Sequence, residues 1–451
     1  MVDADGEAAG MTGDTTGGEL ASAPDAIVSP RIRQLRDDLA ASGDTALAAF
    51  WREIEASGAP LIEEIAGQAD RRLVTFLWRE DAAEPLATII TFDVLSGIST
   101  AGDIADRQLH RLPGTDCWYR SVVVASDLRT SYRFIPNDDL SPIVGDTDYF
   151  TRISKSVGDP LNPNRLFAPW MTFAPDWVRS DAPALDLPDA PPYRWRVKRD
   201  VPAGTLAEET FASERLGNER QIVTWTPPGY ETATDDAMLL VQFDAEFVNG
   251  LFDVVLENLH AEGVVRPIVA VMVGNVDRNA ELPCNAAFAD FLADELVPAM
   301  RERFRIAPGP ESVIVSGASY GGLAAMWAGL TRPDAFGNVL AQSGSFWWWP
   351  DPSFDIATIP AGVVPPWGWL PEQAATWAPV PTRFWMEVGT LEAQGPGPIV
   401  SLLASNRQMR DVLIAKGHDV RYREYAGGHD WFYWPELAAD ALMYLAPPTA
   451  H

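Results

Sequence analysis

The sequence contains little cysteine and no long apolar run. Its 451 residues include two cysteines, Cys117 and Cys284, which lie far apart and form no Cys-x-x-Cys pair. They predict neither a disulfide framework nor a zinc site. No segment approaches the roughly 18 consecutive apolar residues of a membrane helix, and the first 28 residues lack the basic start and apolar core of a secretory signal. We therefore expect a soluble, cytoplasmic protein without membrane insertion.

Basic residues are scarce relative to acidic ones. The chain has 34 Lys and Arg against 63 Asp and Glu, which gives a net charge of -29. Such an acidic field repels polyanions, which argues against nucleic acid or an anionic membrane surface as a partner. The hydrophobic content of 47% is that of a globular protein. The length indicates two or three domains. The sequence does not predict an oligomeric state.

The N-terminal part changes from helical to strand patterning. Residues 1–28 are expected to be a disordered acidic tail, and residues 29–158 begin with two predicted helices, Arg33–Ala41 and Thr45–Ala56. Short runs rich in β-branched and aromatic residues follow: Leu73–Trp78, Leu86–Val94, Leu109–Leu112, Trp118–Ala125 and Thr130–Ile135. Strands at this spacing, without helices between them, predict an antiparallel β-sandwich.

The C-terminal part alternates strands with helices. A proline-rich stretch, 159–193, is expected to be a linker. In residues 194–451 the predicted strands include Thr205–Ser213, Gln221–Trp225, Met238–Phe243 and Pro267–Gly274. The predicted helices are Gly250–Ala261, Cys284–Phe304, Leu323–Leu330, Ile399–Lys416 and Glu436–Leu445. Continuous apolar strands alternating with helices indicate a largely parallel sheet buried on both faces.

Ser319 lies in a Gly-x-Ser-x-Gly pattern between the apolar run Val313–Val315 and a helical segment. The glycines allow a sharp turn that leaves the hydroxyl exposed above a sheet. This motif also occurs in ordinary glycine-rich turns, but the strand before it and the helix after it favour a nucleophile elbow. We therefore expect an α/β hydrolase fold with Ser319 as nucleophile.

A serine hydroxyl needs a base, which is usually histidine. His429 follows the predicted strand Val420–Tyr425 and precedes the last helix, which is the position of the base in α/β hydrolases. The other four histidines lie in the predicted sandwich, at helix ends or at the chain end: His110, His260, His418 and His451. His429 is therefore the predicted base.

The acid of a triad is expected between nucleophile and base in the sequence. Glu392 lies in the loop that leaves the predicted strand Arg383–Val388, where ligand-facing groups of parallel sheets gather. Glu392 is the predicted acid, and Glu387 inside the strand is the alternative. Asp430 is more consistent with a helix cap, and a dyad without an acid is also compatible with the sequence.

An oxyanion hole needs two donors aimed at the developing charge. One is expected to be the backbone N–H of Tyr320, directly after the nucleophile. The other is expected from the loop after Met238–Phe243, at Asp244, Ala245 or Glu246. The chain has no His-Gly-Gly-Gly sequence, which argues against a lipase of that type.

Longer motifs occur in order along both halves of the chain. They are VTFLWR at 74–79, RLPGTDCWY at 111–119, SYRFIP at 131–136, DPLNP at 159–163, ELPCNAAF at 281–288, GASYGG around Ser319, QSGSFWWW at 342–349 and GGHDWFYW at 427–434. Together they resemble the enterochelin (enterobactin) esterase family. The resemblance implies a cytoplasmic serine esterase that opens the trilactone of an iron-loaded catecholate siderophore, with iron as part of the substrate and no other cofactor. It also implies that Arg278 and Glu281 handle substrate and that the sandwich completes the pocket.

Such a substrate agrees with the aromatic content. Nine of the 17 tryptophans lie between Trp347 and Trp434, and flat catechol rings stack on aromatic walls. Trp347, Trp348 and Trp431 are the expected substrate contacts. Because a ferric tris-catecholate is an anion, arginines are also expected at the site, and the candidates are Arg165, Arg199, Arg278 and Arg407.

Two alternatives stay open at the level of sequence. One fold hosts many substrates, so a general carboxylesterase, feruloyl esterase or acyltransferase is compatible with the same scaffold. A siderophore-binding or carbohydrate-binding protein with an inactive triad is the alternative from another class.

Overall fold

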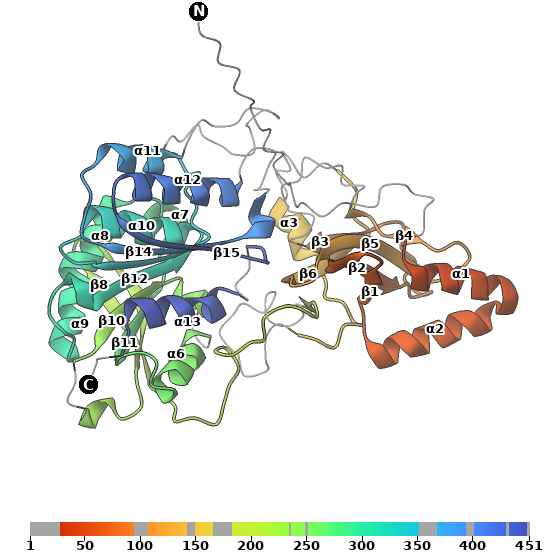
Figure 1. The fold of residues 1–451 in the computed structure, drawn as a ribbon, viewed down its shortest axis with the longest axis horizontal. Coiled ribbons are helices and arrows are strands. Elements are labelled where there is room, and N and C mark those ends of the chain that lie inside the picture. The colour runs from red at the N-terminus through yellow and green to blue at the C-terminus, as the bar shows by residue number, and fades with distance from the viewer. Residues whose placement is uncertain are drawn as a thin grey trace, which may run out of the picture.

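The computed structural model describes residues 28–93, 107–141, 149–165, 183–233, 236–248, 251–350, 368–393, 401–429 and 433–448. The predicted tail, apart from its last residue, lies outside these ranges. Two domains lie side by side, and helices α1 and α2 form the end of the N-terminal domain that points away from the C-terminal one (Figure 1). No helix in the described ranges is both long enough and apolar enough to cross a membrane.

The N-terminal domain is built from two antiparallel sheets and two long helices. The first sheet has the order β1 (Leu61–Ile65), β2 (Gln68–Arg79), β5 (Cys117–Ala125) and β4 (His110–Arg111). The second has the order β3 (Ile89–Asp93), β6 (Arg129–Pro136) and β7 (Ala184–Asp186). The helices are α1 (Pro30–Ser42), α2 (Asp44–Ser57) and the short α3 (Tyr149–Ser154). The predicted helices and sandwich are thus confirmed, while β1 was not predicted.

Alternating side chains of the first sheet bury both of its faces. One face, with Val74 and Phe76 of β2, packs against Tyr132 and Phe134 of the second sheet to form the sandwich core. The other face is covered by helix α2, whose Trp51 is buried. The apolar residues whose spacing predicted the helix therefore form the face that packs against the sheet.

The proline-rich stretch contains a strand that the sequence did not indicate. Residues 184–186 form β7 and pair with β6, with Arg129 opposite Asp186. The Arg129 guanidinium also binds the Asp186 carboxylate. This part of the predicted linker therefore belongs to the N-terminal sheets.

The C-terminal domain contains an eight-stranded sheet with the order β15, β14, β13, β12, β10, β11, β9 and β8. Its strands are β8 (Thr205–Ser213), β9 (Asn218–Thr226), β10 (Met238–Phe243), β11 (Ile268–Val273), β12 (Val313–Ala318), β13 (Asn338–Gln342), β14 (Arg383–Gly389) and β15 (Asp419–Tyr425). Strands β10 to β15 run parallel, and β8 and β9 form an antiparallel edge. The predicted, largely parallel sheet is confirmed.

Helices cover both faces of this sheet. They are α5 (Ala245–Val248), α6 (Phe252–Ala261), α7 (Arg278–Glu281), α8 (Ala286–Phe291), α9 (Val297–Arg303), α10 (Tyr320–Thr331), α11 (Trp369–Thr376), α12 (Leu402–Ala415) and α13 (Trp434–Leu445). A π-helical turn, Leu292–Leu296, joins α8 to α9. Helices α6 and α13 pack on one face, and α8 to α12 pack on the other.

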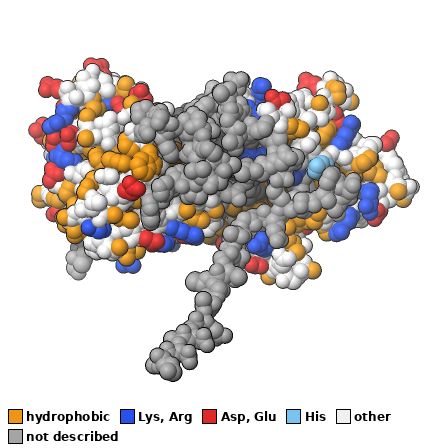
Figure 2. All heavy atoms as spheres, turned by 90° about the horizontal axis from the view of Figure 1, so that it is seen from above, with side chains coloured by type: hydrophobic (Ala, Val, Ile, Leu, Met, Phe, Trp, Pro, Cys, Tyr) orange, Lys and Arg blue, Asp and Glu red, His pale blue; other side chains and the backbone are white. Residues whose placement is uncertain are grey.

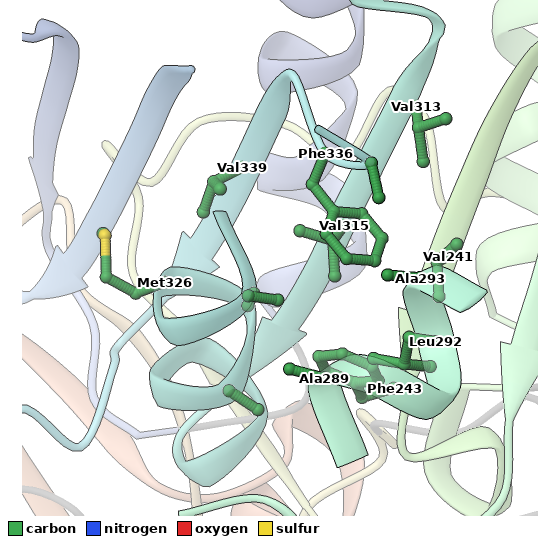
Figure 3. Packing of buried hydrophobic residues seen from close by; sticks show 14 of the residues in the cluster. Val241, Phe243, Ala289, Leu292, Ala293, Val313, Val315, Met326, Phe336 and Val339 are labelled. Atoms are coloured by element: carbon green, nitrogen blue, oxygen red, sulfur yellow. The ribbon is translucent and has the colours of Figure 1, made fainter. Parts of the chain in front are cut away.

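Strand β10 shows why a continuous apolar run fits this position. Leu239, Val241 and Phe243 enter the core on the α10 face, whereas Met238 and Leu240 enter the core on the α13 face. Figure 3 shows side chains of β10, β12 and β13 meeting those of α8, its π-helical extension and α10. Burial on both faces fixes the strand and the loop that follows its carboxyl end.

The charged side chains are mixed on the face of the molecule that Figure 2 shows. Asp and Glu side chains there are interspersed with Lys and Arg over both domains. The net negative charge of the chain does not gather into one acidic patch on the described part of this face.

Candidate active site

The turn between β12 and α10 places Ser319 in a strained backbone conformation, with φ 58° and ψ −119°. A Cβ atom on Gly317 would lie 2.6 Å from the carbonyl of Gly321, and one on Gly321 would lie 3.2 Å from a carboxylate oxygen of Asp244. A side chain at Gly317 would clash with the backbone of the turn, and one at Gly321 would require the Asp244 carboxylate to shift. This is the geometry of a nucleophile elbow, and the glycine spacing in the sequence predicts it for this mechanical reason.

His429 and Glu392 meet at the carboxyl edge of the same sheet. His429 follows β15, and its Nδ1 lies 2.7 Å from Oε2 of Glu392, which is in the 3₁₀ turn Thr390–Ala393 after β14. The Glu392 side chain is 1% exposed and that of His429 is 33% exposed. A buried carboxylate against Nδ1 is the arrangement that fixes the tautomer of a catalytic histidine.

The loop after β13 joins the serine turn to the acid turn. The Ser319 N–H donates to the Gln342 carbonyl at 3.0 Å, and the Ser345 N–H donates to the Ser319 carbonyl at 3.0 Å. The hydroxyls of Ser319 and Ser345 are 3.3 Å apart. In the same loop the Ser343 hydroxyl donates to Oε1 of Glu392 at 2.6 Å. Ser319, Glu392 and His429, the predicted nucleophile, acid and base, therefore lie in three loops at one edge of the sheet.

Glu387, the alternative acid, takes part in a different set of contacts. Its carboxylate is fully buried in β14, pairs with Arg423 at 2.8 Å and accepts the indole N–H of Trp385 at 3.1 Å. It also accepts a hydrogen bond from the side chain of Gln342. These contacts lie between β13, β14 and β15, so this carboxylate holds strands together while Glu392 contacts the histidine.

The expected oxyanion residues flank the elbow. Tyr320 is the first residue of α10, where backbone N–H groups have no intrahelical acceptor. Asp244 follows β10 with φ 61°, and Ala245 begins α5. The buried Asp244 carboxylate accepts from Arg278 at 2.7 and 2.9 Å and from the Asn275 side chain at 2.8 Å. The loop that is expected to supply the second donor is thus fixed by an ion pair.

Known families match both domains of the chain. Residues 213–445 match the family described as "Putative esterase", and residues 73–196 match the family described as "Enterochelin esterase, N-terminal". An iron(III) enterobactin esterase from Dickeya dadantii is 31% identical over 427 residues, which span 88% of this chain and 92% of that protein. The chain belongs to the enterochelin esterase family.

Solved structures agree with this assignment. The ferric enterobactin esterase of Salmonella typhimurium has a TM-score of 0.72 at 25% identity, covering 88% of this chain and 98% of that one. The enterobactin esterase of Shigella flexneri, solved in the presence of enterobactin, has a TM-score of 0.65 at 25% identity, covering 86% and 95%. The predicted α/β hydrolase fold behind an antiparallel domain is confirmed, and the chain is a carboxylic ester hydrolase.

In this enterochelin esterase, two predicted substrate residues, Arg278 and Trp347, form a strip with Tyr320, the predicted oxyanion residue directly after Ser319. The Arg278 guanidinium lies 5.7 Å from the ring centre of Tyr320, and the Trp347 ring lies 6.0 Å from the same ring. Burial raises the pKa of the Tyr320 phenol, and the Arg278 charge partly opposes this. The phenol therefore stays neutral at physiological pH, so the strip combines one cation with two aromatic faces.

Two other predicted substrate residues, Glu281 and Trp348, make contacts within the protein. The Glu281 carboxylate is buried against Arg220 at 2.9 and 3.0 Å, so it is bound within the protein. Trp348 packs edge-on against Trp369 at 6.0 Å, and Trp431 lies outside the described residues.

The remaining candidate arginines of the esterase have their own partners. Arg199 pairs with Glu262 and Arg407 with Glu424, each at 2.7 Å. Arg165 donates to backbone carbonyls of the DPLNP segment, including that of Asp159 at 3.1 Å. Of the four arginines that the sequence suggests, Arg278 is the one with a contact to Tyr320.

Sequence reasoning identified the QSGSFWWW motif at 342–349, which includes the loop after β13, but assigned no role to its Ser343 and Ser345 or to Trp434 at the start of α13. These side chains contact Glu392, Ser319 and His429, respectively. The short apolar run of β13, bounded by Gly337 and Gly344, is the signal that could have identified a buried strand and thus this loop.

Proposed function

We propose that this esterase hydrolyses the ester bonds of a catecholate trilactone siderophore such as enterobactin. In this proposal the substrate is the ferric complex, and its cleavage releases iron in the cytoplasm. The observation that carries the proposal is that similarity to iron(III) enterobactin esterases extends over 88% of the chain and so includes both domains. Iron is part of the substrate, and the reaction uses no further metal or cofactor.

Acylation begins at the elbow. The Ser319 hydroxyl oxygen attacks the lactone carbonyl while Nε2 of His429 accepts its proton. Glu392 accepts a hydrogen bond from the Nδ1–H of His429, with 2.7 Å between Nδ1 and Oε2, and stabilises the imidazolium that forms. The developing oxyanion is stabilised by the Tyr320 N–H and by an N–H of the Asp244–Ala245 loop. His429 then protonates the leaving serine-type alkoxide of the substrate, which opens the ring.

Deacylation repeats these roles with water. His429 removes a proton from water as the water oxygen attacks the acyl carbonyl on Ser319. The imidazolium then gives this proton to the Ser319 oxygen as the bond between that oxygen and the acyl carbon breaks. The product is a linear ester with a free carboxylate. Two further cycles convert a trilactone into its monomeric acids.

The strip beside the nucleophile is consistent with such a substrate. Catechol rings stack on faces such as those of Tyr320 and Trp347, and the ferric tris-catecholate carries negative charge that favours Arg278. Arg278 is 28% exposed, so its guanidinium can reach a ligand while Asp244 holds it in place.

The proposal is tested with purified protein, ferric and iron-free enterobactin, and product separation by chromatography. Linear and monomeric acids are expected from wild type, and Ser319→Ala is expected to lose this activity by at least about a thousandfold. The matched control is Ser316→Ala on β12, because the Ser316 hydroxyl is buried and makes no hydrogen bond within the described residues. This control should keep wild-type activity.

Three outcomes contradict the proposal. Hydrolysis of simple aryl esters alone would identify a general esterase, and siderophore binding without turnover would identify a binding protein. Full activity of Ser319→Ala would remove the serine mechanism.

A further inference from the structure

Ser343 lies directly after β13 and is fully buried. Its φ is 47°, a left-handed conformation that is uncommon for residues other than glycine. Such conformations persist where the surroundings fix them, and they concentrate at functional sites. The contacts of the Ser343 hydroxyl identify what fixes this residue.

The direction of each hydrogen bond at Ser343 follows from the chemistry of its neighbours. An indole N–H can only donate, so Nε1 of Trp434, 3.1 Å away, donates to the Ser343 oxygen. The Ser343 proton is then directed to Oε1 of Glu392, at 2.6 Å. The Gly389 N–H donates to the same oxygen at 2.8 Å. Because Oε1 has two donors, Oε2 is left to face His429.

These contacts close into a ring of four side chains. Glu392 contacts His429, the His429 ring packs edge-to-face on Trp434 at 4.9 Å, Trp434 donates to Ser343, and Ser343 donates to Glu392. Each side chain touches two others. Rotation of the carboxylate away from the histidine would therefore also break its bond to Ser343.

A fifth residue holds the backbone beside the histidine. The Tyr425 hydroxyl donates to the Gly428 carbonyl at 3.2 Å and lies 3.4 Å from the Ser343 oxygen. Burial, together with the nearby Glu392 charge, raises the pKa of the Tyr425 phenol well above its usual range. The phenol keeps its proton and remains a donor to this loop.

We propose that Ser343 is a positioning residue for catalysis: its hydroxyl holds the Glu392 carboxylate in the orientation that contacts His429. The proposal rests on the assignment of Glu392 and His429 under the proposed function. Ser343 does not touch the reacting atoms, so its effect reaches the reaction only through Glu392.

The first test is Ser343→Ala, assayed on a small uncharged aryl ester. Loss of a hydrogen bond to a buried charged group is expected to lower kcat about 10- to 100-fold, with KM changed by less than about threefold because no substrate contact is lost. The matched control is Ser405→Ala on α12, whose buried hydroxyl donates to the Leu402 carbonyl. This control should keep wild-type kcat.

The decisive readout is a double-mutant cycle with Glu392→Ala. If Ser343 acts through Glu392, Ser343→Ala is expected to lower kcat by less than about twofold once Glu392 is absent. An equal loss of kcat in both backgrounds would overturn the proposal. So would wild-type kcat in the single Ser343→Ala variant.

Trp434→Phe provides a second variant if Ser343→Ala fails to fold. It removes the indole donor to Ser343 but keeps an aromatic ring beside His429, and its effect on kcat should likewise vanish in the Glu392→Ala background. An effect that persists there would overturn the proposal. Failure of the proposed function has a different signature, because it leaves Ser319→Ala active or the trilactone uncleaved whatever the cycle shows.

Discussion

Glu387 and Glu392 lie five residues apart, yet substitution of each by glutamine should have opposite consequences. Glu387→Gln removes one charge of a buried ion pair and leaves Arg423 with Asp440, whose side chain is 46% exposed. Breaking a buried pair costs about 3–5 kcal/mol. Because Arg423 is itself 28% exposed and keeps Asp440, we expect a loss of about 2–3 kcal/mol in unfolding free energy.

Glu392→Gln should instead affect the reaction. The donors Ser343 and Gly389 still find a carbonyl oxygen in the amide, and the partner His429 is 33% exposed, so the loss of stability should be about 1 kcal/mol or less. An amide group facing Nδ1 of the histidine favours the wrong tautomer, which lowers kcat by about 10² to 10⁴.

The comparison needs urea unfolding of both variants and kcat on one aryl ester under conditions where each is folded. Glu387→Gln should keep kcat within about threefold of wild type, and Glu392→Gln should lose no more than about 1 kcal/mol of unfolding free energy. The reasoning fails if the two results are exchanged, or if Glu392→Gln retains wild-type kcat.

Two further predictions concern pH and substrate charge. Burial raises the pKa of Asp159, whose carboxylate accepts a hydrogen bond from the Tyr132 hydroxyl, to about 6. The folded protein therefore binds this proton more tightly than the unfolded chain does. About 3 kcal/mol of unfolding free energy that is present below pH 4 is lost as the pH rises through 6. Unfolding from pH 4 to 7 should show this loss in wild type but not in Asp159→Asn, and equal pH profiles would refute it. Arg278→Gln should raise KM for ferric enterobactin about tenfold. The KM for an uncharged aryl ester should rise less than about threefold. An equal rise in both KM values would refute the charge argument, because it would mean that loss of the ion pair with Asp244 had disturbed the loop after β10.

Much of the fold could be predicted because it depends on local patterns. Strands β8 and β10 have the predicted bounds. Alternating apolar and polar residues indicate a strand buried on one face, and a continuous apolar run indicates a strand buried on both. The positions of Ser319 and His429 follow from chain order in a parallel sheet, whose carboxyl ends lie at one edge.

The contacts that the sequence did not reveal join residues distant in the chain. The ion pair between Glu281 and Arg220 requires β9 to lie beside β11. Strand β7 is three residues long and forms because its backbone pairs with strand β6. The hydrogen bond between Ser343 and Glu392 joins two loops 49 residues apart, so periodicity carries no information about it.

The N-terminal domain also supports the catalytic loops directly. Leu391, next to the acid, packs against the core of the sandwich, and its N–H donates to the Gly427 carbonyl at 3.0 Å. From β6, the Arg129 N–H donates to the Ala426 carbonyl at 3.4 Å, and its guanidinium lies 5.8 Å from the Tyr433 ring. The loops that carry Glu392 and His429 therefore make contacts with the N-terminal domain. If Glu392 and His429 act as proposed, the sandwich supports the catalytic geometry together with the hydrolase fold.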